Sequence, residues 1–137
     1  MKIVSKIMLI CDDKLLFSIK RSPGKPEKHD KLELIGGGIK KDETPFQGLI
    51  RELYEEESTG ILARKASKQI PDARRIMVKD KPAYIFKMTI DKNDIKQIQM
   101  DPKESLGYRV IHKSEVINDP KRFTPKTIRI FRSLGMI

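Results

Sequence analysis

The segment from Gly36 to Gly60 constrains the fold more than any other part of the chain, because it combines a glycine turn with a well-marked helix start. Thr44 is a typical N-cap residue, Pro45 suits the first helical position, and Gln47 completes a capping box. We therefore expect a helix that begins near residue 45. Apolar residues recur along it at helical spacing and would pack against a sheet: Phe46, Leu49, Ile50 and Leu53.

The end of this helix and its one internal glycine are also informative. Glu57 falls within the apolar stripe, so the helix should end there. Gly48 lies one turn before Glu52, and a glycine inside a helix costs about 1 kcal/mol relative to alanine. Two explanations stay open for Gly48, which are room for a ligand near the backbone and a packing requirement.

Three carboxylates lie on one stripe of the same helix. At about 100° per residue, Glu52, Glu55 and Glu56 fall within roughly a third of the circumference. Like charges at these spacings repel by roughly a few tenths of a kcal/mol per pair, so stability alone does not select the arrangement. Oxygen ligands from one helix face suit Mg²⁺ or Mn²⁺, which also bind substrate phosphates. A solvated acidic face is the alternative interpretation.

Seven residues of the segment stand at a specific spacing: Gly37, Glu43, Arg51, Glu52, Leu53, Glu55 and Glu56. This spacing reproduces the signature of the Nudix hydrolases, G-x5-E-x7-R-E-U-x-E-E-x-G-U with U aliphatic, so the chain resembles that family. The end of the signature departs from the pattern. Its glycine and aliphatic residue are due at Ser58 and Thr59, whereas this chain has Gly60 and Ile61, as though two residues were inserted after the helix.

The resemblance implies a reaction and the residues that perform it. The family hydrolyses a nucleoside diphosphate linked to another group, by attack of water on a phosphorus of the pyrophosphate. Glu52, Glu55 and Glu56, with a backbone carbonyl near Gly36, would hold Mg²⁺ or Mn²⁺, which neutralises phosphate oxygens and activates water. The general base would be Glu52 or Glu104, since the family's base lies either in the signature or in a later loop.

Other residues would support this chemistry. Arg51 cannot coordinate a cation, so it would pair with Glu43 or Glu52 and hold the loop to the helix for catalysis. Gly37 and Glu43 would be structural residues of the signature. Recognition of the base or sugar would fall to a small set of residues and loops: Arg21, Phe123, residues 22–30 and residues 101–107.

The rest of the chain predicts strands and a closing helix. Residues 2–10 and 14–20 read as an opening hairpin. Further strands are expected over 32–35, 61–67, 74–79, 83–90 and 108–112, of which 83–90 is the most apolar and is expected to be central.

The connections predict little regular structure until the C-terminus. Residues 91–102 read as a polar connection, with one helical turn as an option, and a short turn is expected at 114–116. Thr124-Pro125 repeats the cap-plus-proline signal, which predicts a final helix over 125–134 ended by Gly135. This order of elements predicts one α/β domain over residues 1–137. The resemblance implies a Nudix-like α/β/α sandwich around a mixed β-sheet, with the signature forming a loop-helix-loop.

Charge and composition bound the partners. The chain has 29 Lys and Arg against 19 Asp and Glu, a net charge of +10, although its central helix is acidic. The positive charge elsewhere would attract polyanions such as nucleotides or RNA, or it merely keeps the surface solvated. Apolar runs are too short to span a membrane, and Cys11 is the only cysteine, so no intrachain disulfide can form. A cytoplasmic location is therefore expected, and the protein is expected to be a monomer or a homodimer.

Three functions remain in competition. The leading hypothesis is a small-nucleotide pyrophosphohydrolase, and the second is removal of pyrophosphate from RNA 5′ ends, which the net charge favours. The third is a Nudix-like nucleotide- or RNA-binding regulatory domain without turnover. The intact set of Glu52, Glu55 and Glu56 argues against this third hypothesis, and the displaced Gly60 keeps it open.

Overall fold

The computed structural model describes residues 3–137, so Lys2, the first residue of the expected strand 2–10, lies outside the described residues. The strands are β1 (Val4–Cys11), β2 (Lys14–Lys20), β3 (Leu32–Glu33), β4 (Ile35–Gly38), β5 (Ala73–Val78), β6 (Lys81–Thr89) and β7 (Ser105–His112). The helices are α1 (Pro45–Glu56), α2 (Ile61–Gln69), α3 (Lys92–Gln97), α4 (Lys113–Asn118) and α5 (Pro125–Ser133), with a 3-10 turn at Pro120–Arg122.

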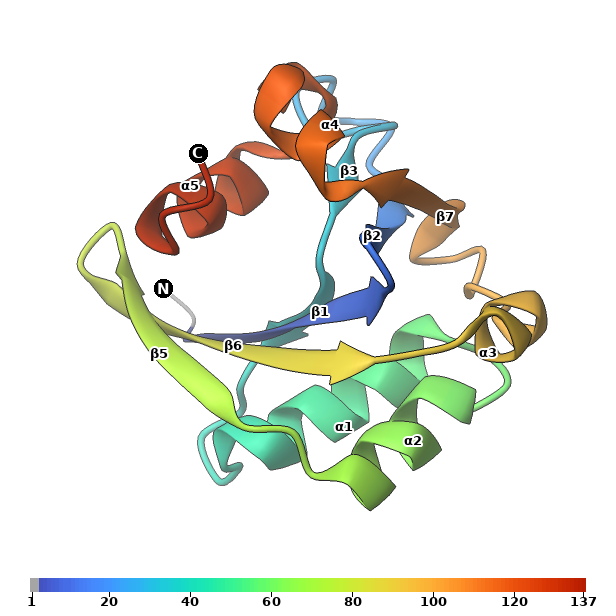
Figure 1. Ribbon diagram of the computed structural model, residues 1–137. Coiled ribbons are helices and arrows are strands. Elements are labelled where there is room, and N and C mark those ends of the chain that lie inside the picture. The colour runs from blue at the N-terminus through green and yellow to red at the C-terminus, as the bar shows by residue number, and fades with distance from the viewer. Residues whose placement is uncertain (1–2) are drawn as a thin grey trace.

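The strands form a mixed sheet in the order β3-β2-β1-β6-β5 (Figure 1). β1 and β6 run parallel, whereas β1 pairs antiparallel with both β2 and β4. β7 adds antiparallel to β2. β6 lies between β1 and β5, which confirms the expected central position of its apolar segment. β4 pairs with the first half of β1, so residues 36–38, which were expected to form the glycine turn and keep that name below, lie in a strand of the sheet.

Helices cover both faces of this sheet, as Figure 1 shows. One core cluster joins β1 and β6 to the helices α1 and α2 through buried residues such as Leu49, Leu53 and Leu62. The other cluster packs α5 against the opposite face, with Phe17 and Phe131 at its centre. The structure therefore confirms the predicted α/β sandwich around a mixed sheet. None of the helices within residues 3–137 is long and apolar enough to cross a bilayer.

The start and end of α1 agree with the sequence-based prediction. The Thr44 hydroxyl accepts from the Gln47 N–H at 3.1 Å, and the Gln47 side chain accepts from the Thr44 N–H at 2.9 Å, which forms the expected capping box. Leu49 and Leu53 are fully buried on the sheet side. The helix ends at Glu56 with Glu57 as its C-cap, because Glu57 turns inward and is buried.

The strand expected over residues 61–67 is wrong, since these residues form α2. Leu62, Ala63 and Ala66 are fully buried, and their spacing of one, three and four residues is that of a helix face rather than of alternating strand positions. Gly60 precedes the helix with a φ of 78°, a left-handed conformation that favours glycine. The displaced glycine of the signature therefore serves as the start of a second helix packed on α1.

The loop between α1 and α2 is organised by the Glu57 carboxylate. It accepts hydrogen bonds from the Thr59 N–H at 3.1 Å, the Ile61 N–H at 3.1 Å and the Gln99 N–H at 3.0 Å. A carboxylate beside the first N–H groups of α2 also suits the positive end of the helix dipole. The Asp101 N–H in turn donates to the Glu56 carbonyl at 2.8 Å. The segment before β7 is thereby attached to the end of α1.

The C-terminal predictions hold with small shifts. Residues 91–102 include the short helix α3 at Lys92–Gln97. α5 ends at Ser133, one residue before the expected end, and Gly135 follows with a φ of 76°. The strand before α4 is longer than the expected 108–112, because the chain pairs with β2 from Ser105 onward.

Candidate active site

A cleft of about 560 Å³ brings together α1, the glycine turn of β4, β1 and α5. Its lining includes an acidic set, which we define as Glu52, Glu56 and Glu104. It also includes a basic set, which we define as Lys6, Lys20, Lys126 and Arg129. The backbone of residues 36–38 lines the same cleft. Carboxylate and cationic side chains thus line one space.

Glu56 is the most deeply buried acid of the cleft, with 7% of its surface exposed. Its Oε2 accepts a hydrogen bond from the Gly36 N–H at 2.8 Å. Burial raises the pKa of the Glu56 carboxyl to about 7, although Lys6 and the Gly36 N–H both act to lower it. A cation bound beside Glu56 would favour its ionised form.

Glu52 lies in the same cleft, whereas Glu55 does not line it. Burial, and next the charge of Glu55, raise the pKa of Glu52. The Glu55 side chain is 49% exposed, and its carboxylate accepts from Arg51 Nη1 at 3.2 Å. The structure therefore brings two of the three expected carboxylates of α1 to the cleft and directs the third towards solvent.

Arg51 connects the glycine turn to α1, as expected. Its Nε and Nη2 donate to the two carboxylate oxygens of Glu43 at 2.7 Å and 2.9 Å. Nη2 also donates to the Gly38 carbonyl at 2.8 Å, and Nη1 reaches Glu52 at 3.2 Å. The hydrogen bonds from Arg51 and from the Lys40 N–H lower the pKa of Glu43 to about 2. This bidentate contact holds the loop and the helix in one arrangement.

Two glycines permit close approaches around these carboxylates. A Cβ added to Gly37 would lie 2.5 Å from the carboxyl carbon of Glu52, so a side chain at this position would displace Glu52. A Cβ added to Gly48 would lie 3.4 Å from Glu43 Oε1 and from Ile39 Cγ1. The contacts of the buried Gly48 favour the packing explanation, because the loop of Glu43 covers it.

Lys6 is a site residue that sequence reasoning missed. It is 8% exposed, and its ammonium donates to the Gly36 carbonyl at 3.1 Å and to the Leu34 carbonyl at 3.3 Å. The available signal was a lysine at the start of a largely apolar strand, two residues from both Val4 and Met8. Buried lysines are rare unless they are paired. Here the charge is placed beside the buried carboxylate of Glu56.

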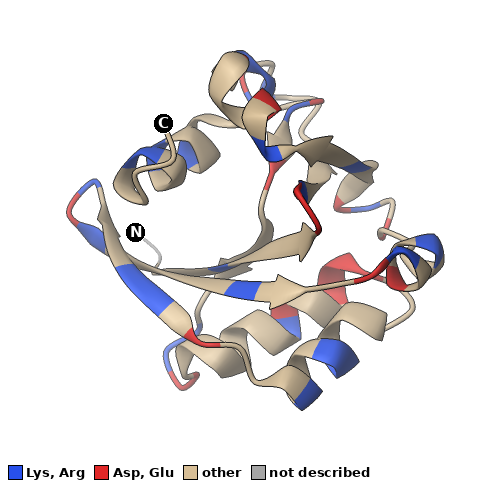
Figure 2. Ribbon diagram, in the orientation of Figure 1, with Lys and Arg blue, Asp and Glu red and all other residues tan. Residues whose placement is uncertain are grey.

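Two members of the basic set, Lys126 and Arg129, place positive charge on the α5 side of the cleft. Burial, followed by the charges of Lys6 and Lys28, lowers the pKa of Lys126. The Lys20 ammonium lies 3.7 Å from a carboxylate oxygen of Glu33. Figure 2 shows basic positions along α5 and acidic positions along α1. A bound anion would relieve the repulsion within this set.

The remaining predicted residues divide between the cleft, its support and the core. Glu104 lines the cleft. Arg21 does not line it, but its Nη1 donates to the Pro102 carbonyl at 2.9 Å and so fastens the loop that carries Glu104. Phe123 is only 1% exposed and packs edge-on against Phe17, with ring centroids 5.0 Å apart. Its expected role in substrate binding is corrected, because a ring enclosed in the core has no surface for a ligand.

The donor chemistry of the cleft fits a hard divalent cation. Within residues 3–137, no three His, Cys, Asp or Glu side chains form a closed metal-binding group. Glu52, Glu56 and Gly36 nevertheless line one cleft, and the Gly36 carbonyl, which accepts from the Lys6 ammonium at 3.1 Å, keeps a second lone pair. Mg²⁺ is typically held by one or two carboxylates and completes its coordination with water and substrate phosphates. These three residues would therefore hold the cation.

Solved structures of other proteins share this fold. A bifunctional NMN adenylyltransferase/ADP ribose pyrophosphatase from Francisella tularensis, complexed with AMP and a manganese ion, aligns over 98% of this chain with 18% identity and a TM-score of 0.66. This chain spans 41% of that protein. The MutT protein of Methanosarcina mazei Go1 aligns over 95% of this chain and 88% of its own, with 18% identity and a TM-score of 0.63.

An Ap4A hydrolase from C. elegans aligns over 99% of this chain and 98% of its own, with 12% identity and a TM-score of 0.60. These identities establish a shared fold alone. No curated protein matches the chain by sequence. A family model described as NUDIX domain, however, matches residues 1–134, nearly the whole chain. The protein therefore belongs to the Nudix hydrolase family.

Proposed function

We propose that this protein hydrolyses the pyrophosphate bond of a nucleoside diphosphate linked to another group, with Mg²⁺ or Mn²⁺ as its cofactor. One observation carries the proposal: Glu52 and Glu56 share a cleft with the backbone of Gly36 and with the basic set. A pyrophosphate needs cationic partners for its oxygens and an anionic site for a divalent cation, and this cleft offers both.

The residues of the cleft divide the work. Glu52, Glu56 and the Gly36 carbonyl would hold the cation, which would neutralise phosphate oxygens and make water a better nucleophile. Lys126 and Arg129 bind phosphate oxygens and orient the substrate. Glu52 or Glu104 accepts the proton of the attacking water. Arg51 is a positioning residue that keeps Glu52 against the glycine turn.

The proteins of similar fold support a nucleotide substrate. They are described as an ADP ribose pyrophosphatase domain, a MutT protein and an Ap4A hydrolase, and the first was solved with AMP and manganese. Their substrates differ, so the family membership of this chain leaves its own substrate to be measured.

A substrate screen tests the proposal. Purified protein is assayed with Mg²⁺, with Mn²⁺ and with chelator on (d)NTPs, dinucleoside polyphosphates, ADP-ribose, other nucleotide sugars and 5′-triphosphorylated RNA. Turnover of one class that disappears with chelator is expected. The Glu52→Gln variant should lose it, and Asp72→Asn, at an exposed loop residue, should keep it. Turnover that continues in chelator would refute the mechanism.

Action on RNA 5′ ends is the second candidate, and the net charge of +10 favours it. A protein that contacts six or more RNA phosphates loses affinity by powers of ten between about 50 and 200 mM salt, because counterions are released on binding. ATP offers few phosphates, so its affinity should change much less. Equal salt dependence for triphosphorylated RNA and ATP would remove this candidate. Nucleotide binding without any turnover in the screen would instead identify a regulatory domain.

A further inference from the structure

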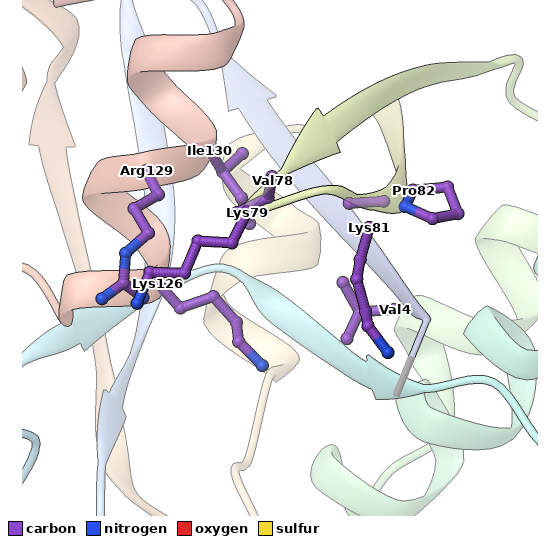
Figure 3. A pocket seen from close by; sticks show the side chains of 9 residues that line it. Val4, Val78, Lys79, Lys81, Pro82, Lys126, Arg129 and Ile130 are labelled. Carbon is purple, nitrogen blue, oxygen red and sulfur yellow. The ribbon is translucent and has the colours of Figure 1, made fainter. Parts of the chain in front are cut away.

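A second pocket lies beside the cleft, between the turn of the β5–β6 hairpin and α5 (Figure 3). Its volume is about 270 Å³. Lys79 and Lys81 come from the hairpin, whereas Lys126 and Arg129 come from the helix. Val4 and Ile130 contribute to its apolar lining. We call this space the hairpin pocket.

Its charged lining has one sign. Among the residues that the structure describes, four charged ones line the hairpin pocket, and all four are cations. Within residues 3–137, Lys79, Lys126 and Arg129 form no ion pair with a carboxylate within 4.0 Å. Lysine and arginine side chains only donate hydrogen bonds. The pocket therefore suits an anion better than the mixed donor and acceptor edge of a nucleobase.

The two walls are joined, so the pocket is a defined part of the fold. The Ser133 hydroxyl of α5 donates to the Met77 carbonyl of β5 at 3.0 Å. Lys79 and Asp80 both have left-handed backbone, with φ of 49° and 63°, as expected for a tight two-residue hairpin turn. This turn places Lys79 and Lys81 opposite the helix.

The hairpin pocket is continuous with the cleft, because Val4, Lys126 and Arg129 line both. A substrate whose pyrophosphate lies beside Glu52 and Glu56 therefore passes these shared cations to enter the pocket. Crowded positive charge also lowers the pKa of Lys126 after burial does, through Lys6 and Lys28. An anionic group at this junction would satisfy cations from both spaces.

We propose that the hairpin pocket binds a further phosphate of the substrate, one that lies outside the hydrolysed pyrophosphate. The inference rests on the proposed function and deepens it. It assigns the substrate to nucleotides that carry an additional phosphate, either as a monoester on the ribose or as the first phosphodiester of an oligonucleotide.

Matched ligand pairs test the subsite by binding, without any need for turnover. Adenosine 3′,5′-bisphosphate is compared with AMP by calorimetry, and the extra phosphate should lower the Kd about tenfold through charge-assisted hydrogen bonds. Lys79→Asn should remove most of this gain, since asparagine tolerates the left-handed turn and carries no charge. The control Lys68→Gln removes one charge from an exposed residue of α2 and should keep the gain.

Turnover assays then identify the source of the phosphate. NADP⁺ against NAD⁺ and coenzyme A against dephospho-coenzyme A report a ribose monoester, and pppApA against ATP reports a phosphodiester. If kcat/KM rises only for the ligands with a ribose monoester, or only for the ligand with a phosphodiester, and the rise is smaller in Lys79→Asn, that kind of phosphate is the one bound. The subsite is overturned if the bisphosphate gains nothing over AMP, or if the gain survives in the Lys79→Asn/Lys81→Gln double variant. Failure of the proposed function gives a different result: no substrate is turned over, but adenosine 3′,5′-bisphosphate still binds more tightly than AMP.

Discussion

The acidic and basic sets of the cleft are built in different ways. Glu52 and Glu56 belong to one helix, and hydrogen bonds from Arg51 and from the Gly36 N–H hold them against the glycine turn. Lys20, Lys126 and Arg129 come from β2 and α5, and a weak contact of Lys20 with Glu33 is the one ion pair they form within residues 3–137. Glu52 and Glu56 are therefore preorganised, as is Lys6 through its bonds to the Leu34 and Gly36 carbonyls, whereas Lys20, Lys126 and Arg129 are held mainly by the packing behind them.

This difference assigns different tasks to the two sides. Catalysis needs the cation and the attacking water at fixed positions, which rigid carboxylates provide. Phosphate oxygens are recognised by charge more than by direction, and long flexible lysine side chains can follow them. Changes on the acidic side should consequently affect turnover strongly, and changes on the basic side should affect affinity.

The largest effect is expected for Glu56→Gln. Activity should fall by more than the roughly 10–100-fold typical of residues that only support a metal ligand. Without metal, the fold should be at least as stable, because a buried charge is removed. Mg²⁺ should raise the Tm of the wild type more than that of the variant, since binding to the native state alone stabilises it.

Glu55→Gln is the matched comparison for this prediction, because it makes the same change on the same helix at a carboxylate that is 49% exposed. Its loss of activity should be clearly smaller. Near-full activity and an unchanged Mg²⁺ shift in Glu56→Gln would show that these carboxylates form only a solvated face.

A second, smaller effect is expected for Arg51→Ala. The change leaves the partly buried Glu43 without its bidentate partner and releases the Gly38 carbonyl, so both Tm and activity should decrease, the activity by about 10–100-fold. The Tm and activity of Arg51→Lys should lie between those of the wild type and Arg51→Ala, since an ammonium cannot make the bidentate contact. Lost activity with unchanged melting would place Arg51 on the substrate instead.

The third effect concerns the pH dependence of stability without metal. The pKa of Glu56 rises from an ordinary 4.5 to about 7 on folding, so the folded protein binds more protons than the unfolded chain between these values. Its free energy of unfolding should therefore decrease as the pH rises from 4.5 to 7, by on the order of 3 kcal/mol. Glu56→Gln should lack this decrease. Chemical denaturation at several pH values measures it, and parallel curves for both proteins would contradict it.

The smallest effect is expected for Lys6→Met, which probes the one member of the basic set bonded to the glycine turn. Removing this charge should strengthen Mn²⁺ binding severalfold, because a cation no longer repels the metal, and should lower the metal-free Tm near neutral pH, because Glu56 loses its neighbour. Titration of Mn²⁺ followed by electron paramagnetic resonance gives the Kd without an activity assay. The exposed Lys87→Gln serves as control, and an equal Kd in all three proteins would rule out this role.

The parts of the fold that depend on local signals could be predicted from the sequence. The cap of Thr44 and Gln47 and the position of Glu57 located α1, because each acts within one or two turns. The strand expected at 61–67 failed since a short mixed segment of apolar and basic residues fits two periodicities. This segment becomes a helix because Leu62 and Ala66 pack against α1, a contact that the local sequence does not reveal.

The site could be predicted only in part for the same reason. A helical stripe places Glu55 and Glu56 side by side, and only β4 decides that Glu56 is covered while Glu55 remains exposed. Lys6 enters the site through the register of β1 with β4, a pairing about 30 residues apart in the chain. Phe123 precedes a helix and was expected to contact the substrate, but its contacts with Phe17 place it in the core.

The Glu57 carboxylate has a consequence for the order in which the molecule forms. It binds Gln99, and Asp101 binds the Glu56 carbonyl, so the end of α1 is completed by residues some forty positions later. Such contacts carry a loop-closure cost and form slowly compared with helices. During synthesis, the loop of Glu104 cannot dock on α1 until the chain has passed residue 101. Because α5 is made later still, Lys126 and Arg129 are the last lining residues of the cleft to be synthesised.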